Sequence, residues 1–207
     1  VLQQQQQQKS SFRSDQAQRQ KILAELESQL KSQGRHLSQL EGDAKELKSL
    51  IDSLSEILTE DIESPRSTEK FASLKGRLSW PVKGDVKKLY GQTKPPSNLL
   101  WQGVVIHASQ GNNVRAISHG RIAFADWLRG MGNLIIIDHG NGYLSLYGHN
   151  ESLFKSSGEW VEAGDIIGSI GNSGGQSDPG LYFEIRVKGK PQNPARWCKT
   201  SNWFRSI

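Results

Sequence analysis

Apolar side chains in the first third of the chain recur at the spacing of an amphipathic helix. From residue 23 to residue 58 they follow intervals of three and four, at Leu23, Leu26, Leu30, Leu37, Leu40, Ala44, Leu47, Ile51, Leu54 and Leu58. This spacing predicts one helix of about five heptads with a coiled-coil-like apolar seam. Gln33 interrupts the seam, and a polar residue there can fix the register of pairing. A lone helix would leave the seam in water, so we expect a partner from another chain or from an upstream helix.

The segment before this seam, residues 1–20, is polar and contains an uninterrupted run from Gln3 to Gln8. Such a segment cannot bury a core by itself. A fraying helix and a disordered tail are the two alternatives for it.

A joint is predicted after the seam. Pro65 disfavours helix at the residue before it. Ser67 can cap a short helix that carries Phe71 and Leu74 and ends at Gly76.

From Trp80 onward, short β-rich runs alternate with Gly, Asn and Pro. Such runs occupy residues 104–106, 133–138 and 181–187. Asn141-Gly142 is a strong hairpin signal between two of the apolar runs. This half of the chain is therefore predicted to be an antiparallel β domain.

The chain as a whole is predicted to be of the α + β class, with a coiled-coil helix followed by a mainly antiparallel β domain. The expected boundaries are residues 1–62 for the coiled-coil segment, 63–76 for a linker with the short helix, and 77–207 for the β domain.

Composition narrows the function classes only slightly. The net charge of +5 and the isoelectric point near 9.3 permit contact with an anionic polymer. The basic runs are short, as at Lys87-Lys88 and at Lys188 with Lys190, so we expect a solvated surface and no nucleic acid partner. Cys198 is the single cysteine, which excludes an intramolecular disulfide. The sequence contains no run of about 18 apolar residues, so no membrane-spanning helix is predicted.

The most informative motif lies near the carboxyl end. Residues 172–186 read Asn-Ser-Gly-Gly-Gln-Ser-Asp-Pro-Gly-Leu-Tyr-Phe-Glu-Ile-Arg. The stretch resembles the zinc-binding strand of lysostaphin-type (LytM-like) cell-wall endopeptidases, where a Gly-rich turn leads into His-x-His and then Phe-Glu-Ile-Arg. Gly180 and Tyr182 stand at the two histidine positions. The frame of the motif is present without its metal ligands.

The resemblance places the remaining zinc ligands in a His-x-Gly-x-Asp-type segment, which corresponds here to residues 101–106. Trp101 replaces the histidine and Val105 replaces the aspartate. Indole, isopropyl and phenol groups offer no useful lone pair to a divalent metal, so we expect no metal and no other cofactor. The family's catalytic histidine corresponds to His149. Because imidazole has no hydrolytic task without zinc, we interpret it as a polar lining residue.

The resemblance extends over residues 78–197 through landmarks in one order. They are Trp80-Pro81-Val82-Lys83-Gly84, Tyr90-Gly91, Gly120-Arg121-Ile122, residues 132–140, Tyr147-Gly148-His149, Val161-Glu162-Ala163-Gly164-Asp165 and Asn193-Pro194. Together they are specific, although each alone is weak. A degenerate peptidase site after a run of heptads is similar to the EnvC family of murein hydrolase activators.

Membership in this family implies a non-catalytic activator of periplasmic N-acetylmuramoyl-L-alanine amidases, controlling septal peptidoglycan cleavage in cell division. The coiled coil would then meet a membrane-embedded division regulator, whereas simple packing or dimerisation of the helix is the alternative. The chain starts at Val1 without a signal peptide. It therefore resembles a mature fragment, and export is inferred from the family alone.

The former peptidase cleft is the predicted amidase-binding groove. Its expected lining is Trp101, Gln102, Val105, Met131, Leu134, His149, Tyr182 and Arg186. Aromatic and adaptable apolar anchors beside an arginine suit protein recognition. Val105 and Leu134 can equally be ordinary core residues. We also expect the segment from about residue 44 to 74 to occupy this groove at rest, unless the helix pairs only along its seam.

Two other functions stay open from the sequence. One is an active zinc metallopeptidase of the cell wall that uses unexpected ligands. The other is a peptidoglycan-binding scaffold, which the basic charge and the ancestry of the cleft favour.

Overall fold

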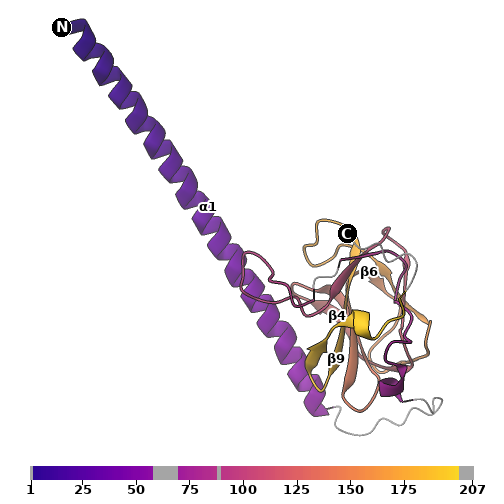
Figure 1. Ribbon diagram of the computed structural model, residues 1–207. Coiled ribbons are helices and arrows are strands. Elements are labelled where there is room, and N and C mark those ends of the chain that lie inside the picture. Colours follow the sequence, from indigo (N-terminus) through magenta and orange to yellow (C-terminus); the bar gives the residue numbers. More distant parts are fainter. Residues whose placement is uncertain (1, 58–69, 88–89, 201–207) are drawn as a thin grey trace. The chain divides into compact units, whose positions relative to one another are not determined.

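The computed structural model describes residues 2–57, 70–87 and 90–200 (Figure 1). The chain divides into two compact units, Val1–Glu41 and Gly42–Ile207. The first unit holds the N-terminal part of helix α1 (Leu2–Ile57), and the second holds the C-terminal part of α1 with all the described strands. The predicted boundary at residue 62 lies outside the described residues. The predicted boundaries of the three segments stay predictions.

Helix α1 confirms the predicted helix and includes the Gln-rich segment from Leu2 onward. Glutamine has a high helix propensity, and each added residue extends an existing helix without a new nucleus. In the first unit, Leu23, Leu26 and Leu30 of the seam are 58%, 48% and 68% exposed. No described helix combines the length and hydropathy that a bilayer span requires.

The β domain contains ten strands among the described residues. They are β1 (Asp85–Lys87), β2 (Val104–His107), β3 (Asn113–Arg115), β4 (Gly120–Leu128), β5 (Gly132–Asp138), β6 (Tyr143–Leu153), β7 (Trp160–Val161), β8 (Ile166–Ile170), β9 (Gly180–Val187) and β10 (Lys190–Gln192). Two short 3₁₀ helices, η1 (Phe71–Leu74) and η2 (Pro194–Arg196), flank them in sequence. The predicted α + β class is confirmed.

Every strand pair is antiparallel. The main strand order is β1-β2-β9-β6-β5-β4-β7, with β10 on β9 and β8 joining β3 to β6. The predicted hairpin joins β5 to β6, and φ is 55° at Asn141 and 75° at Gly142. These positive φ values match the turn type for which Asn-Gly is favoured. The turn thereby fixes the register of the two most central strands.

Side chains on the two faces of the sheet form two apolar clusters. Alternation along β9 places Leu181, Phe183 and Ile185 in the larger cluster. The smaller cluster lies on the opposite face and includes residues of α1. It consists of Leu47 and Ile51 from α1 with Leu128, Leu134, Ile136, Leu144 and Leu146 from the sheet. We call the sheet face that carries this smaller cluster the groove face.

The predicted short helix is present as η1, although Ser67 and Pro65 lie outside the described residues. Lys70 precedes η1 without a side-chain cap, and Gly76 follows it with φ 79°. Phe71 of η1 is buried and stacks on His139 with ring centroids 4.4 Å apart. Cys198 lies buried in the same cluster, where burial raises the pKa of its thiol to about 12.

His139 is held as a neutral imidazole in this core. Its Nδ1 lies 2.5 Å from the carbonyl oxygen of His119 and therefore carries the proton. Its Nε2 lies 2.7 Å from Ser145 Oγ, within hydrogen-bonding distance. Burial is the main cause that lowers the pKa of His139 to about 3.

Replacing His139→Asn is expected to flatten the pH dependence of unfolding. The folded-state pKa of about 3 lies below the ordinary value of 6.5. The unfolded chain therefore binds protons first, and stability falls as pH drops below that ordinary value. This residue contributes up to about 1.4 kcal/mol per pH unit to the slope of the free energy of unfolding against pH. Denaturant unfolding from about pH 7 to about pH 4.5 measures the slope. His36→Asn, at an exposed position on α1, is the control, and equal slopes in both variants would contradict the assignment.

Candidate functional site

Tyr182 of β9 is the centre of the predicted groove. Val105 of β2 is its register partner on one side, and Gly148 of β6 is its partner on the other. The ring of Trp101 lies 6.5 Å from the Tyr182 ring between centroids, and the ring of His149 lies 6.3 Å away. The structure therefore brings together the residues at the former ligand positions, although they are separated by up to about eighty positions in sequence.

The remaining predicted groove residues adjoin this centre. Met131 accepts a hydrogen bond at its carbonyl from the backbone N–H of His149, at 2.8 Å. It also packs against the smaller apolar cluster, which contains Leu134. Arg186 Nη2 donates to Gln102 Oε1 at 2.6 Å. These contacts link members of the predicted groove, whose role as a binding site stays a prediction.

A buried polar network occupies the floor of this region. Tyr182 Oη donates to Glu184 Oε2 at 2.8 Å, and Arg186 Nε donates to Glu184 Oε1 at 2.7 Å. Tyr182, Glu184 and Arg186 are only 4%, 0% and 4% exposed. Burial raises the pKa of Glu184, although the Arg186 charge opposes the rise. Burial together with the Glu184 charge raises the pKa of Tyr182 well above its usual range.

Glu184 was missed as a site residue at the sequence level. The signal was available, because residues 182, 184 and 186 of one strand point to the same face. Tyr182 and Arg186 are therefore positioned by a carboxylate between them. The phenol oxygen of Tyr182 is committed to that carboxylate.

These residues do not fit a zinc ion. Indole, isopropyl and hydrogen-bonded phenol groups stand where imidazole and carboxylate ligands are needed. Among the described residues, no group of three or more His, Cys, Asp and Glu side chains is placed to hold a metal. His149 Nδ1 lies 2.8 Å from the Ser173 carbonyl oxygen, and burial is the main cause that lowers its pKa to about 4. His149 is a neutral lining residue near pH 7.

The C-terminal part of α1 packs on the groove face within the second unit. Leu47 and Ile51 are 4% and 1% exposed and share the smaller apolar cluster with Leu134. Fully burying two such side chains contributes about 1.5 to 3 kcal/mol each, as an upper bound. Arg129 Nε lies 2.8 Å from Asp43 Oδ1, but Arg129 is 58% exposed, and an ion pair of this kind contributes about 0 to 1 kcal/mol. Apolar burial therefore dominates this contact.

Gly130 allows the close approach of α1 to the turn between β4 and β5. A Cβ at this position would lie 2.6 Å from the Asp43 side chain, whereas a Cβ on Gly42 would meet only the flexible end of the exposed Arg129 side chain. Gly130 also has φ 76°, a conformation that other residues rarely adopt. Charged side chains also lie where α1 approaches Trp101 of the predicted groove. Lys94 Nζ lies 4.7 Å from the centroid of the Trp101 ring, and Asp43 partly offsets the lowering of the Lys94 pKa by burial.

Comparisons with known proteins agree with this geometry. Residues 100–194 match the model of Peptidase family M23. The chain carries an M23 peptidase domain. A crystal structure of an M23 peptidase candidate from Pseudomonas aeruginosa superimposes with a TM-score of 0.56 at 18% identity, over 74% of this chain and 60% of that one. At this identity the match supports the fold alone.

Two relatives carry names that bear on function. The murein hydrolase activator EnvC of Escherichia coli (strain K12) is 37% identical over 205 residues, covering 95% of this chain and 47% of that protein. The murein hydrolase activator NlpD of the same organism is 40% identical over 119 residues, covering 57% of this chain and 30% of that protein. The chain spans less than half the length of these relatives. The family resemblance predicted from the motifs is confirmed.

Glu184→Ala is expected to destabilise the β domain by about 3 to 5 kcal/mol, because it leaves Arg186 buried without its carboxylate. Equilibrium unfolding in denaturant measures the loss. Glu162→Ala, at an exposed position, is the control and should change stability by about 0.5 kcal/mol or less. Similar small losses in both variants would show that the Tyr182, Glu184 and Arg186 network does not support the site.

Proposed function

We propose that this chain is a non-catalytic activator of a zinc N-acetylmuramoyl-L-alanine amidase. The observation that carries the proposal is the pair of Trp101 and Tyr182, aromatic rings at former ligand positions of an M23 domain. By this proposal the region of the former ligand positions recognises a protein, with the partly exposed Trp101 as its aromatic anchor and the buried Tyr182 supporting it. Relatives named murein hydrolase activators support this assignment.

Activation is explained by differential binding. An amidase that is closed at rest opens if the activator binds the open form more tightly than the closed form. A helix of the amidase can lay its apolar face in the groove beside Trp101 and Met131, which are both partly exposed. By this proposal the protein acts in the periplasm on septal peptidoglycan cleavage, and it does not cut the wall itself.

The resting state of the activator is closed by its own helix. Leu47 and Ile51 lie on the groove face, so α1 competes there with the amidase helix. Because the competitor belongs to the same chain, its effective concentration is high. The exposed leucines of the seam, Leu23, Leu26 and Leu30, are the contact for a membrane-embedded division regulator, which would shift α1 away from the sheet.

Amidase activity on dye-labelled cell walls, with and without the full chain, tests the proposal. Dye release should rise when the chain is added and should not occur with the chain alone. Trp101→Ala should weaken activation about thirtyfold at subsaturating protein, since an aromatic anchor contributes about 2 kcal/mol. Trp127→Ala, which removes a tryptophan that is 56% exposed, is the matched control and should activate normally. Wall cleavage by the chain alone, or no stimulation of any amidase, would refute the function.

Ile51→Asp is expected to increase activation by at least about tenfold at low activator concentration, because a buried carboxylate would release α1 from the sheet. Ser53→Asp places the same charge at an exposed position of α1 and should leave activation unchanged. Removal of residues 1–75 provides an independent comparison. If the shortened protein and the Ile51→Asp variant are folded and activate no better than the full chain, α1 does not close the groove.

A further inference from the structure

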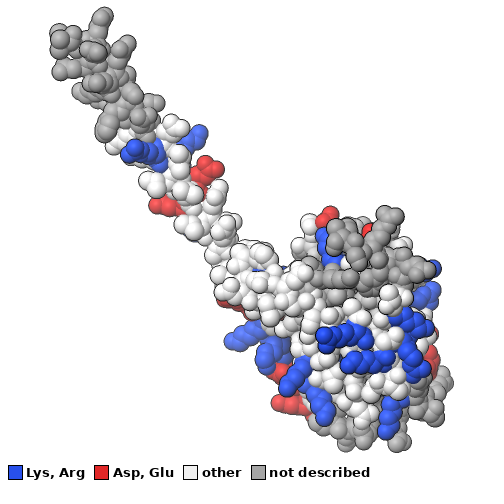
Figure 2. All heavy atoms as spheres, viewed as in Figure 1, with Lys and Arg blue, Asp and Glu red and all other residues white. Residues whose placement is uncertain are grey.

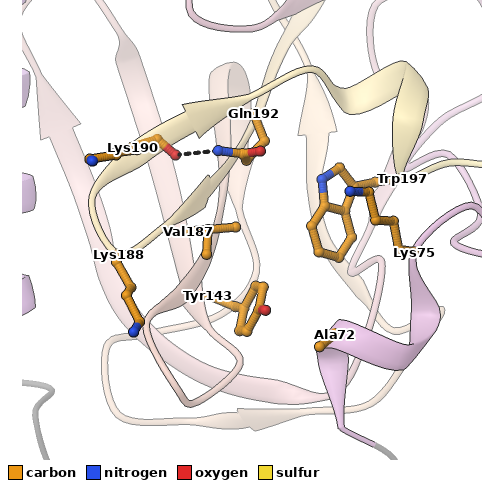
Figure 3. Close-up of a pocket in the computed structure, with 8 residues that line it drawn as sticks. All are labelled: Ala72, Lys75, Tyr143, Val187, Lys188, Lys190, Gln192 and Trp197. Atoms are coloured by element: carbon orange, nitrogen blue, oxygen red, sulfur yellow. Dashed lines mark hydrogen bonds between the residues drawn. The ribbon is translucent and has the colours of Figure 1, made fainter.

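A cavity lies away from the predicted groove, between η1, the start of β6 and the β9–β10 turn (Figure 3). Its volume is about 430 Å³. The floor contains the apolar and aromatic side chains Tyr143, Val187 and Trp197, and the rim contains Lys75, Lys188 and Lys190, with Ala72 and Gln192 beside them. Figure 3 shows Lys188 and Lys190 on one side of this floor and Lys75 on the other, next to Trp197.

The rim is positively charged without local neutralisation. Among the described residues, no carboxylate forms an ion pair with Lys75, Lys188 or Lys190. Lys75 Nζ lies 5.5 Å from the centroid of the Trp197 ring, so this ammonium group is held over the aromatic floor. Lys and Arg side chains also outnumber Asp and Glu on the face of the β domain seen in Figure 2. The cavity therefore combines an aromatic floor with a field that attracts anions.

The backbone at the rim adopts a conformation that a lysine rarely takes. Lys188 has φ 52° and is followed by Gly189 with φ 73°, whereas Asn, Asp or Gly is preferred at such a position. Lys188 N also donates to the Gly142 carbonyl oxygen at 2.7 Å, which ties the turn to the β5–β6 hairpin. The turn thus carries a lysine where Asn, Asp or Gly would fit the backbone better, and such outliers cluster at functional sites.

The cavity and the groove lie on opposite faces of the sheet. Tyr143 and Val187 are register partners and pack against the larger apolar cluster. Tyr182 and Arg186 point to the groove face, because they alternate with the residues of that cluster along β9. Occupation of the cavity therefore leaves the groove free for another protein.

We propose that this cavity is a binding site for peptidoglycan, with a sugar ring on its floor and a carboxylate of the peptide stem at its lysine rim. The choice of peptidoglycan rests on the proposed function, which places the protein at the cell wall. Trp197 is only 4% exposed, so the apolar face of a sugar ring would lie against the partly exposed Tyr143 and Val187. The ammonium groups of the rim suit carboxylates as point charges. The site would hold the activator on the wall while the groove engages the amidase.

Sedimentation of the full chain with purified peptidoglycan sacculi, without amidase, tests the site. The double variant Lys188→Asn, Lys190→Gln should bind the sacculi about tenfold more weakly at low salt. Its melting temperature should not fall, because Asn tolerates the left-handed backbone at position 188. The control Lys31→Asn, Lys83→Gln removes the same charge from two exposed lysines outside the cavity and should bind as the unchanged chain does.

Three results would overturn the site. They are unchanged binding by the cavity variant, an equal loss in the control variant, and binding of the chain to anionic phospholipid vesicles as tight as its binding to sacculi. A second assay tests the proposed activator function independently of wall binding. Activation of the amidase on a soluble muropeptide does not require attachment to the wall, so the cavity variant should stimulate that reaction normally. Absence of stimulation by the unchanged chain would refute the activator role and leave the sedimentation result to be judged alone.

Discussion

The strict alternation of side chains along β9 is the constraint on which the rest of the structure depends. Leu181, Phe183 and Ile185 point into the larger apolar cluster, and residues 182, 184 and 186 point to the groove face. A strand between β2 and β6 cannot shift by one residue without exchanging these two sets. The buried core therefore fixes where Tyr182 and Arg186 stand, and the groove inherits its geometry from packing on the other face.

The polar side chains of β9 on the groove face satisfy one another. Glu184 is fully buried and is satisfied by Tyr182 and Arg186, which would otherwise bring an unpaired phenol and an unpaired cation to the same place. Unpaired buried charge is strongly destabilising. These three side chains thus form a self-contained network, and in the function that we propose, recognition would fall to the partly exposed Trp101 and Met131.

The C-terminal part of α1 uses the same face for a different purpose. Its seam residues Leu47 and Ile51 are apolar at coiled-coil spacing, and in this unit the sheet takes the place of a partner helix. The seam residues Leu23 and Leu30 in the first unit remain exposed. One periodic pattern therefore serves two kinds of contact, one within the chain and one that we propose lies outside it.

By itself the sequence determined the helix, the antiparallel strands, the Asn141-Gly142 hairpin and the replaced ligand positions, because these follow from local periodicity, turn chemistry and motif order. The eight groove residues named from the sequence stay a prediction. Only the tertiary structure decided that the sheet covers Leu47 and Ile51, since apolar spacing is the same for any apolar partner. The cavity beside Trp197 could not be predicted from the sequence either, because η1, β6 and β10 meet there only through long-range packing.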